Sequence, residues 1–238
     1  MTWLALALLA VVAGTVGGIC GFGSSVMLLP LLTATLGPKA AVPVMAVASL
    51  IGNMSRVAVW WREVDWRAVA AYSATAVPAA ALGARTLVAL DARSVEMALG
   101  AFLVGVVPYR HWAARRGHRV RLAGLAVGGA VLGFLTGIVA STGPVNAPLF
   151  LAYGLAKGAY ISTEAASSAF VYLTKVGVFS ALDALTPETA RIGLAIGAAL
   201  FVGALIARRL VEHVSSQVFV RALDALLVVV GLAMLIVH

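Results

Sequence analysis

The chain has 238 residues, of which 62% are hydrophobic and 11% are charged, and its formal net charge is +8 at pH 7. Soluble domains hold roughly 25% charged residues, so this composition predicts a polytopic integral membrane protein with almost no soluble part. It argues against a nucleic-acid-binding protein, because no soluble basic domain is left to carry the positive charge. With a single cysteine, Cys20, and histidines that fall in predicted loops or at the C-terminus, we expect no metal and no cofactor.

Ten apolar segments, five in each half of the chain, are predicted to be helical. In chain order they are residues 2–20, 25–36, 40–61, 68–90, 94–108, 122–141, 144–156, 159–182, 190–207 and 219–237. A helix needs about 20 apolar residues to cross a bilayer, so 25–36 and 144–156 are expected to be half-helices or re-entrant segments. The first 20 residues lack a basic start and continue directly into membrane segment, which indicates a first span instead of a cleaved signal peptide.

Residues 109–121, between the two halves, contain five arginines and no acidic residue. Such a cluster predicts a cytoplasmic linker; a site for anionic lipid or a partner is the alternative. Counting spans outward from this linker places both chain termini in the periplasm. An odd number of segments per half gives the halves opposite orientations. We therefore expect an all-α protein of the cell membrane with two inverted-topology repeats, residues 1–108 and 122–238.

Glycine-rich breaks interrupt the apolar sequence at matching places in the two halves. The first contains Gly21, Gly23, Ser24 and Ser25 and is followed by Pro30 and Gly37; the second contains Ser141, Thr142 and Gly143 and is followed by Pro148 and Gly154. A broken helix must satisfy its freed backbone groups away from lipid. Two breaks at corresponding places in two halves are typical of a transporter's binding site near the midplane.

Two cations within predicted spans also occupy related places. Arg56 lies 26 residues after Pro30, and Lys175 lies 27 residues after Pro148. Asn53 and Tyr172 each come three residues before one of these cations and share its helix face. We expect the two cations to attract an oxyanion, with backbone N–H groups at the half-helix N-termini as further donors. The predicted substrate-binding residues are Arg56, Lys175, Asn53, Tyr172, Gly21, Gly23, Ser24, Ser25, Ser141, Thr142, Gly143 and Asn146.

Each of these residues has a simpler interpretation. Arg56 and Lys175 can snorkel to opposite membrane faces, and Asn146 can cap the loop of its own break. Glycines spaced four apart fit close helix packing, most clearly Gly193 and Gly197. Glu164 is the candidate proton carrier, or else it neutralises Lys157 or Lys175.

The doubled pattern of Gly21-Phe22-Gly23-Ser24-Ser25 and Ser141-Thr142-Gly143, each followed by its proline and glycine, resembles the TauE/SafE family, known as sulfite exporters. The loop Glu63-Val64-Asp65-Trp66 is similar to a common loop of that family. The likeness covers essentially the whole chain, although the second motif departs from the usual glycine run. The resemblance implies export of sulfite or a related organosulfonate.

The sequence therefore predicts a secondary transporter that exports a small sulfur oxyanion by alternating access. An anion channel and an exporter of another small anion, such as a carboxylate, remain alternatives. A membrane-embedded enzyme is disfavoured because no histidine lies within a span to serve as a base, and a structural subunit with inert breaks is the third rival. The expected partners are the anion, the lipid bilayer and, for a homodimer, a second copy of the chain.

Overall fold

The structure, a computed structural model, describes residues 3–116, 119–139, 141–210 and 228. All regular structure in the described part of the chain is helical, which confirms the all-α prediction. The predicted segment 219–237 lies outside the described residues, apart from residue 228.

The helices follow the predicted segments closely. They are α1 (Trp3–Cys20), α2 (Ser24–Leu36), α3 (Pro38–Val59), the short 3₁₀ helix η1 (Trp61–Glu63), α4 (Trp66–Ala89), α5 (Ala92–Arg116), α6 (Leu122–Ile138), α7 (Gly143–Tyr153), α8 (Lys157–Ala181) and α9 (Pro187–Leu210). The largest difference is in α5, which was expected to end at residue 108 and continues to Arg116. Residues 109–116 contain no glycine or proline and include good helix formers, so the first part of the predicted linker extends the helix.

Local sequence signals fix several of these boundaries. Gly37, with a φ of 78°, separates α2 from α3, and Pro38 begins α3; proline favours the first position of a helix. The Asp65 carboxylate caps α4 by accepting the Arg67 and Ala68 N–H groups at 3.0 and 3.1 Å. Gly154, with a φ of 108°, ends α7.

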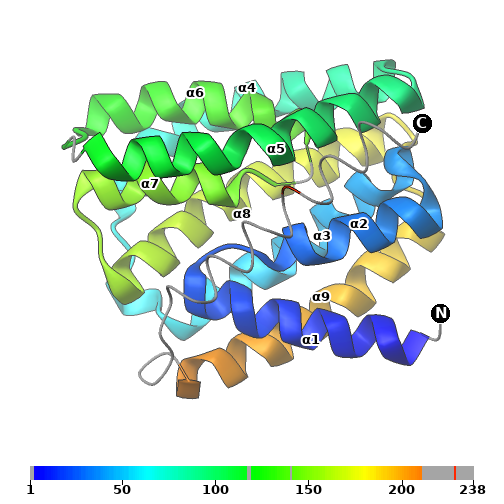
Figure 1. The fold of residues 1–238 in the computed structure, drawn as a ribbon, viewed down its shortest axis with the longest axis horizontal. Coiled ribbons are helices and arrows are strands. Elements are labelled where there is room, and N and C mark those ends of the chain that lie inside the picture. Colours follow the sequence, from blue (N-terminus) through cyan, green and yellow to red (C-terminus); the bar gives the residue numbers. More distant parts are fainter. Residues whose placement is uncertain (1–2, 117–118, 140, 211–227, 229–238) are drawn as a thin grey trace.

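The long helices pack in one continuous order, α1–α9–α3–α8–α4–α6, with α3 and α8 at the centre. The short helix α2 folds back after α1 and packs on α1 and α3, while α7 folds back after α6 and packs on α6 and α8 (Figure 1). The helix α5 lies against α7 and α3. Each half of the described chain therefore contributes a hairpin of one long and one short helix.

Glycines allow the outer pairs of helices to approach closely. A Cβ atom added to Gly14 of α1 would lie 2.5 Å from the Leu200 carbonyl oxygen of α9, and one added to Gly133 of α6 would lie 2.5 Å from the Ala76 carbonyl oxygen of α4. The predicted packing role of Gly193 and Gly197 is confirmed, because their added Cβ atoms would lie 2.7 and 2.5 Å from side chains of α3. Such small-residue contacts are typical of helices packed within a membrane.

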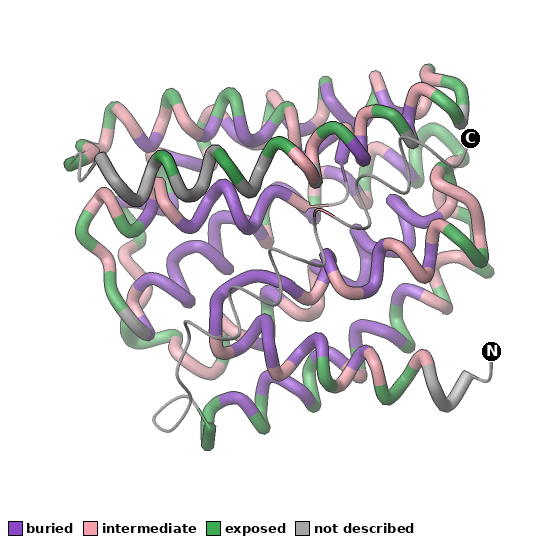
Figure 2. The backbone as a smooth tube through the Cα atoms, viewed as in Figure 1, coloured by how far each residue is buried: buried purple, intermediate pink, exposed green. Residues whose placement is uncertain are grey.

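Large apolar side chains cover the outside of the bundle, and the buried residues gather along its interior (Figure 2). Leu8 of α1, Val127 of α6 and Leu173 of α8 are each more than half exposed. The helices α3 and α9 are long and apolar enough to cross a bilayer. An apolar exterior of this extent fits a surface in contact with lipid tails.

Candidate functional site

The first break lies between α1 and α2 and depends on two glycines. Gly21 and Gly23 have φ angles of 78° and 112°, a region that residues with a side chain rarely adopt. A Cβ atom on Gly21 would also lie 2.7 Å from the Tyr160 hydroxyl oxygen. These conformations turn the chain back so that α2 begins at Ser24, and no side chain caps its first N–H groups.

The second break lies between α6 and α7 and contacts the first. The helix α6 ends at Ile138, and α7 begins at Gly143 without a side-chain cap from Thr142. A Cβ atom on Gly143 would lie 2.8 Å from the Phe22 Cβ atom. The two breaks therefore meet inside the bundle, and the N-terminus of one half-helix lies near each side of the contact.

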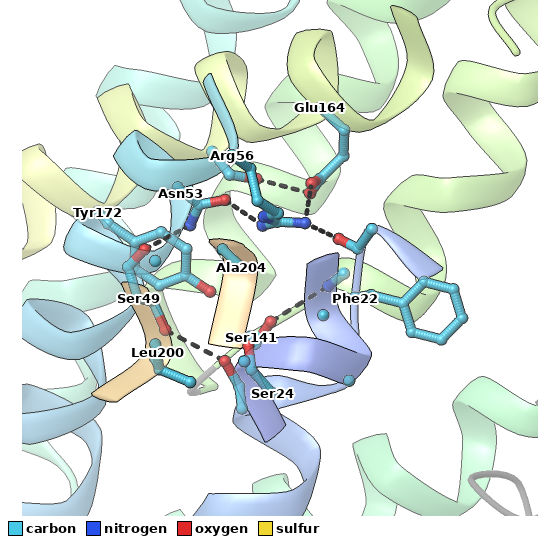
Figure 3. A pocket seen from close by; sticks show the side chains of 18 residues that line it. Phe22, Ser24, Ser49, Asn53, Arg56, Ser141, Glu164, Tyr172, Leu200 and Ala204 are labelled. Carbon is cyan, nitrogen blue, oxygen red and sulfur yellow. Dashed lines mark hydrogen bonds and ion pairs between the residues drawn. The ribbon is translucent and has the colours of Figure 1, made fainter. Parts of the chain in front are cut away.

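A small cavity of about 30 Å³ lies where the breaks meet α3, α8 and α9. Most of the predicted site residues line this cavity: Gly21, Gly23, Ser24, Ser25, Asn53, Arg56, Ser141, Gly143 and Tyr172. Leu200 and Ala204 of α9 form an apolar part of its wall (Figure 3). The cavity is therefore polar on the side of the breaks and of the two central helices, and apolar on the side of α9.

Arg56 is the cation of the cavity. Its guanidinium group donates hydrogen bonds to the Gly21 carbonyl oxygen and to the Asn53 side-chain oxygen. It also forms an ion pair with Glu164 of α8, with 3.4 Å between Nη1 and Oε2, and the two side chains point toward each other in Figure 3. Asn53 is fixed in turn by donating to the Ser49 carbonyl oxygen at 2.7 Å. Arg56 does not snorkel to the membrane surface, since its side chain is only 11% exposed.

Glu164 is the acidic residue of the cavity and was not among the predicted site residues. Its Oε1 atom accepts hydrogen bonds from Ser168 at 2.8 Å and from the Asn146 amide at 3.3 Å. Asn146 accepts a hydrogen bond from the Tyr72 hydroxyl at 3.1 Å. The sequence indicated Glu164 only as a proton carrier or as a partner of Lys157 or Lys175, whereas the structure pairs it with Arg56. A contact between different halves has no signal in sequence spacing.

Hydroxyl groups complete the polar wall. The Ser25 and Ser49 hydroxyls lie 3.1 Å apart, and the Ser141 hydroxyl accepts the Gly143 N–H at 3.3 Å. The Tyr172 side chain interacts with those of Ser141 and Ser49. Ser49 and its counterpart Ser168 were not predicted, although each lies one helical turn before Asn53 or Tyr172. That spacing is the signal that could have identified them.

Lys175 does not line the cavity, which corrects the expectation that it would meet Arg56 there. It is fully buried, and its ammonium group donates to the carbonyl oxygens of Thr136 and, at 2.8 Å, of Val139. Its nitrogen lies 5.5 Å from the centre of the Tyr172 ring, on which the cavity depends. The last carbonyl groups of a helix carry partial negative charge and lack partners, so the cation is held at the end of α6.

Two further predicted residues lie behind the cavity wall. Thr142 hydrogen-bonds with Thr136, and Asn146 links Tyr72 to Glu164. Both are buried, and neither lines the cavity. Their side chains therefore support the second break and the Glu164 carboxylate, respectively.

This arrangement fits a small anion better than a metal or a reaction centre. The site offers one guanidinium group, several hydroxyl groups and the uncapped N-termini of α2 and α7, all of which donate hydrogen bonds to oxyanions. No group of three metal-ligating side chains occurs among the residues that the structure describes.

Comparison with known proteins gives one match. The family model described as "Sulfite exporter TauE/SafE" matches residues 6–234. No curated protein and no solved structure matches the chain.

Proposed function

The chain belongs to the TauE/SafE family of sulfite exporters and is an integral membrane transporter, and on this premise we propose that it exports a small sulfur oxyanion through the cavity at the two breaks. The substrate is sulfite or a small organosulfonate. The observation that carries this proposal is the buried Arg56 guanidinium group in a cavity shared by both breaks. A guanidinium group binds planar or tetrahedral oxyanions through several hydrogen bonds in a fixed geometry.

The size of the cavity supports the smaller substrate. A volume of about 30 Å³ holds a few water molecules or one compact ion. Sulfite fits this description better than an organosulfonate with a long carbon chain, which would need the cavity to widen. Leu200 and Ala204 provide an apolar wall against which only a short substituent could pack.

Alternating access between two inverted repeats is the proposed mechanism. The order α1–α9–α3–α8–α4–α6 is unchanged when it is reversed and each helix is exchanged for its counterpart in the other half, α1 for α6, α3 for α8 and α4 for α9. In addition, Arg56 binds the Gly21 carbonyl and Lys175 binds the Val139 carbonyl. Gly21 and Val139 are 118 residues apart, as are Pro30 and Pro148. Both observations support residues 1–108 and 122–238 as equivalent units that rock around the breaks.

The orientation follows from the positive charge of the linker. With residues 109–121 in the cytoplasm, the hairpin of α1 and α2 enters from the periplasm and that of α6 and α7 enters from the cytoplasm. Both chain termini are then periplasmic. The positive-inside rule is the support for this placement.

The test is anion flux into and out of liposomes that contain the purified protein. The panel comprises sulfite, sulfate, thiosulfate, sulfoacetate and simple carboxylates. We expect saturable flux of sulfite with turnover typical of a carrier, and its loss in Arg56→Gln. The matched control is Arg85→Gln, which removes the same charge at an exposed position of α4.

Three outcomes would overturn the proposal in different ways. A preference for carboxylates would reject the sulfur substrate but leave the site in place. Flux far above carrier turnover would favour a channel. Unchanged flux in Arg56→Gln would remove the cavity from the transport path.

A further inference from the structure

Glu164 is placed in the cavity in a way that anion binding alone does not require. Its side chain is 2% exposed, and it directs one carboxylate oxygen at Arg56 and the other at Ser168 and Asn146. A site that only needed to attract an anion would be weakened by a carboxylate beside its single lining cation. The negative charge therefore requires an explanation in the transport cycle.

An oxyanion and the Glu164 carboxylate would compete for the same guanidinium group. Arg56 keeps its proton under all physiological conditions, so its positive charge can be matched by one of the two anions at a time. Two anions held together in a buried site repel each other, and this repulsion favours the protonated form of the carboxylic acid. Binding of the oxyanion at Arg56 is therefore linked to uptake of a proton by Glu164.

The other groups that face Glu164 do not take over this role. The helix α3 presents Arg56, α4 presents the Tyr72 hydroxyl, and α7 presents the neutral amide of Asn146. On α8 itself, Ser168 donates a hydrogen bond and Tyr172 lies on the same face.

Two more elements pack on α8 farther along the helix. From η1, the carboxylate of Glu63 lies beside Gly158, well over one turn before Glu164. At the end of α6, the carbonyl groups face Lys175, three turns after Glu164. Glu164 is thus the carboxyl group among the described residues that line the cavity.

We propose that Glu164 is a proton-binding site that couples one proton to each exported anion, in the same direction, through exchange of its ion pair with Arg56. This inference rests on the proposed function. The proton comes from water on the cytoplasmic side, remains on the carboxyl group while the anion occupies Arg56, and returns to water on the periplasmic side. Glu164 then pairs with Arg56 again. With a doubly charged anion, one net negative charge moves outward, and the inside-negative membrane potential drives that movement.

The first test is calorimetric binding of sulfate and methanesulfonate to the purified full-length protein. The charge of both probes is constant between pH 5 and 9, so a change in binding reports the protein. Titrations in buffers of different ionisation enthalpy give the number of protons taken up per bound anion. We expect uptake approaching one proton, and an affinity that rises up to about tenfold per unit fall in pH while Glu164 is ionised in the free protein.

The variant Glu164→Gln mimics the protonated acid and should separate the two processes. We expect its affinity for sulfate to change by less than about twofold across the same pH range, with no linked proton uptake. Glu188→Gln is the matched control, since Glu188 is an exposed glutamate in the first turn of α9, and it should retain the wild-type pH dependence. Thermal unfolding and size-exclusion profiles show whether each variant is folded.

The outcomes distinguish this inference from the proposed function. If the wild-type protein binds the anions with no proton uptake and with an affinity independent of pH, the coupling role is overturned and the anion site stands. If sulfite, sulfate and methanesulfonate all fail to bind, both proposals fall together. The wild-type measurement decides the question even if Glu164→Gln does not fold.

A second readout uses liposomes that enclose a pH-sensitive dye. Sulfate flux through the wild-type protein should carry protons in the same direction as the anion. Glu164→Gln should move sulfate without a matching change in internal pH. Proton movement opposite to the anion would overturn co-transport.

Discussion

The two breaks share one design, but only one of them brings its cation to the cavity. In each repeat, a basic residue on the third helix binds the carbonyl group that is exposed where the first helix ends: Arg56 at Gly21 and Lys175 at Val139. Arg56 also reaches Asn53 and Glu164 in the cavity, whereas Lys175 is fully buried with its carbonyl partners. Satisfying the broken backbone is therefore the role that both cations share, and ligand binding is added at one of them.

The comparison is tested most strongly by Arg56→Gln. Removing this charge leaves the buried Glu164 carboxylate without its partner, and breaking such a pair costs about 3–5 kcal/mol of stability. We expect a large fall in melting temperature in detergent together with loss of anion binding. The double variant Arg56→Gln with Glu164→Gln should recover much of the stability but none of the binding. Recovery of binding as well would show that the guanidinium group does not hold the anion.

Lys175→Met should separate stability from binding. The carbonyl groups of Thr136 and Val139 lose their donor, and an unsatisfied buried acceptor costs about 1–3 kcal/mol. We expect a lower melting temperature and an affinity for sulfite within about threefold of the wild type. A selective loss of affinity at unchanged stability would return Lys175 to the anion site.

The glycines of the two breaks should differ in tolerance. In Gly21→Ala the new side chain combines a φ of 78° with a contact of 2.7 Å to the Tyr160 hydroxyl, so we expect a cost of about 2–3 kcal/mol. Gly143→Ala meets only the Phe22 side chain and should cost about 1 kcal/mol. Gly177→Ala, in open space on α8, is the control and should be neutral or slightly stabilising. Equal unfolding temperatures for the first two variants would contradict the difference between the breaks.

The smallest effect is expected from the hydroxyl pair of Ser25 and Ser49. Ser49→Ala removes one neutral hydrogen bond in the cavity wall, which is worth about 0.5–1.5 kcal/mol. We expect affinity for sulfite to fall by about three- to tenfold in a binding titration, with little change in melting temperature. Ser180→Ala, on the same helix as Lys175 but at an exposed position near its end, should leave affinity unchanged.

The helices and the breaks were largely predictable from sequence because both are local properties. Long apolar runs specify helices, and glycine-rich stretches specify where those helices stop, so most boundaries fell within a few residues. The helix α5 was underestimated because its last turns are charged, and hydropathy does not register helix propensity. Most residues of the cavity could be named in advance because they lie in the breaks or one turn from a cation.

What depended on contacts between distant segments was not predictable in the same way. Equal spacing from Pro30 and Pro148 made Arg56 and Lys175 look equivalent, but spacing does not specify which groups compete for a side chain. The end of α6 offers Lys175 two carbonyl oxygens, while Glu164 from the other half of the chain draws Arg56 into the cavity. Burial makes each of these pairings costly to break.

By itself, the sequence determined an all-helical membrane bundle with two matching interruptions, because hydropathy and glycine content act within short stretches of chain. The tertiary structure decided that the interruptions touch at Phe22 and Gly143 and that the cavity holds one ion pair instead of two cations. Side-chain charges find their partners across the packed helices, and that choice follows from distance and burial instead of from order along the chain.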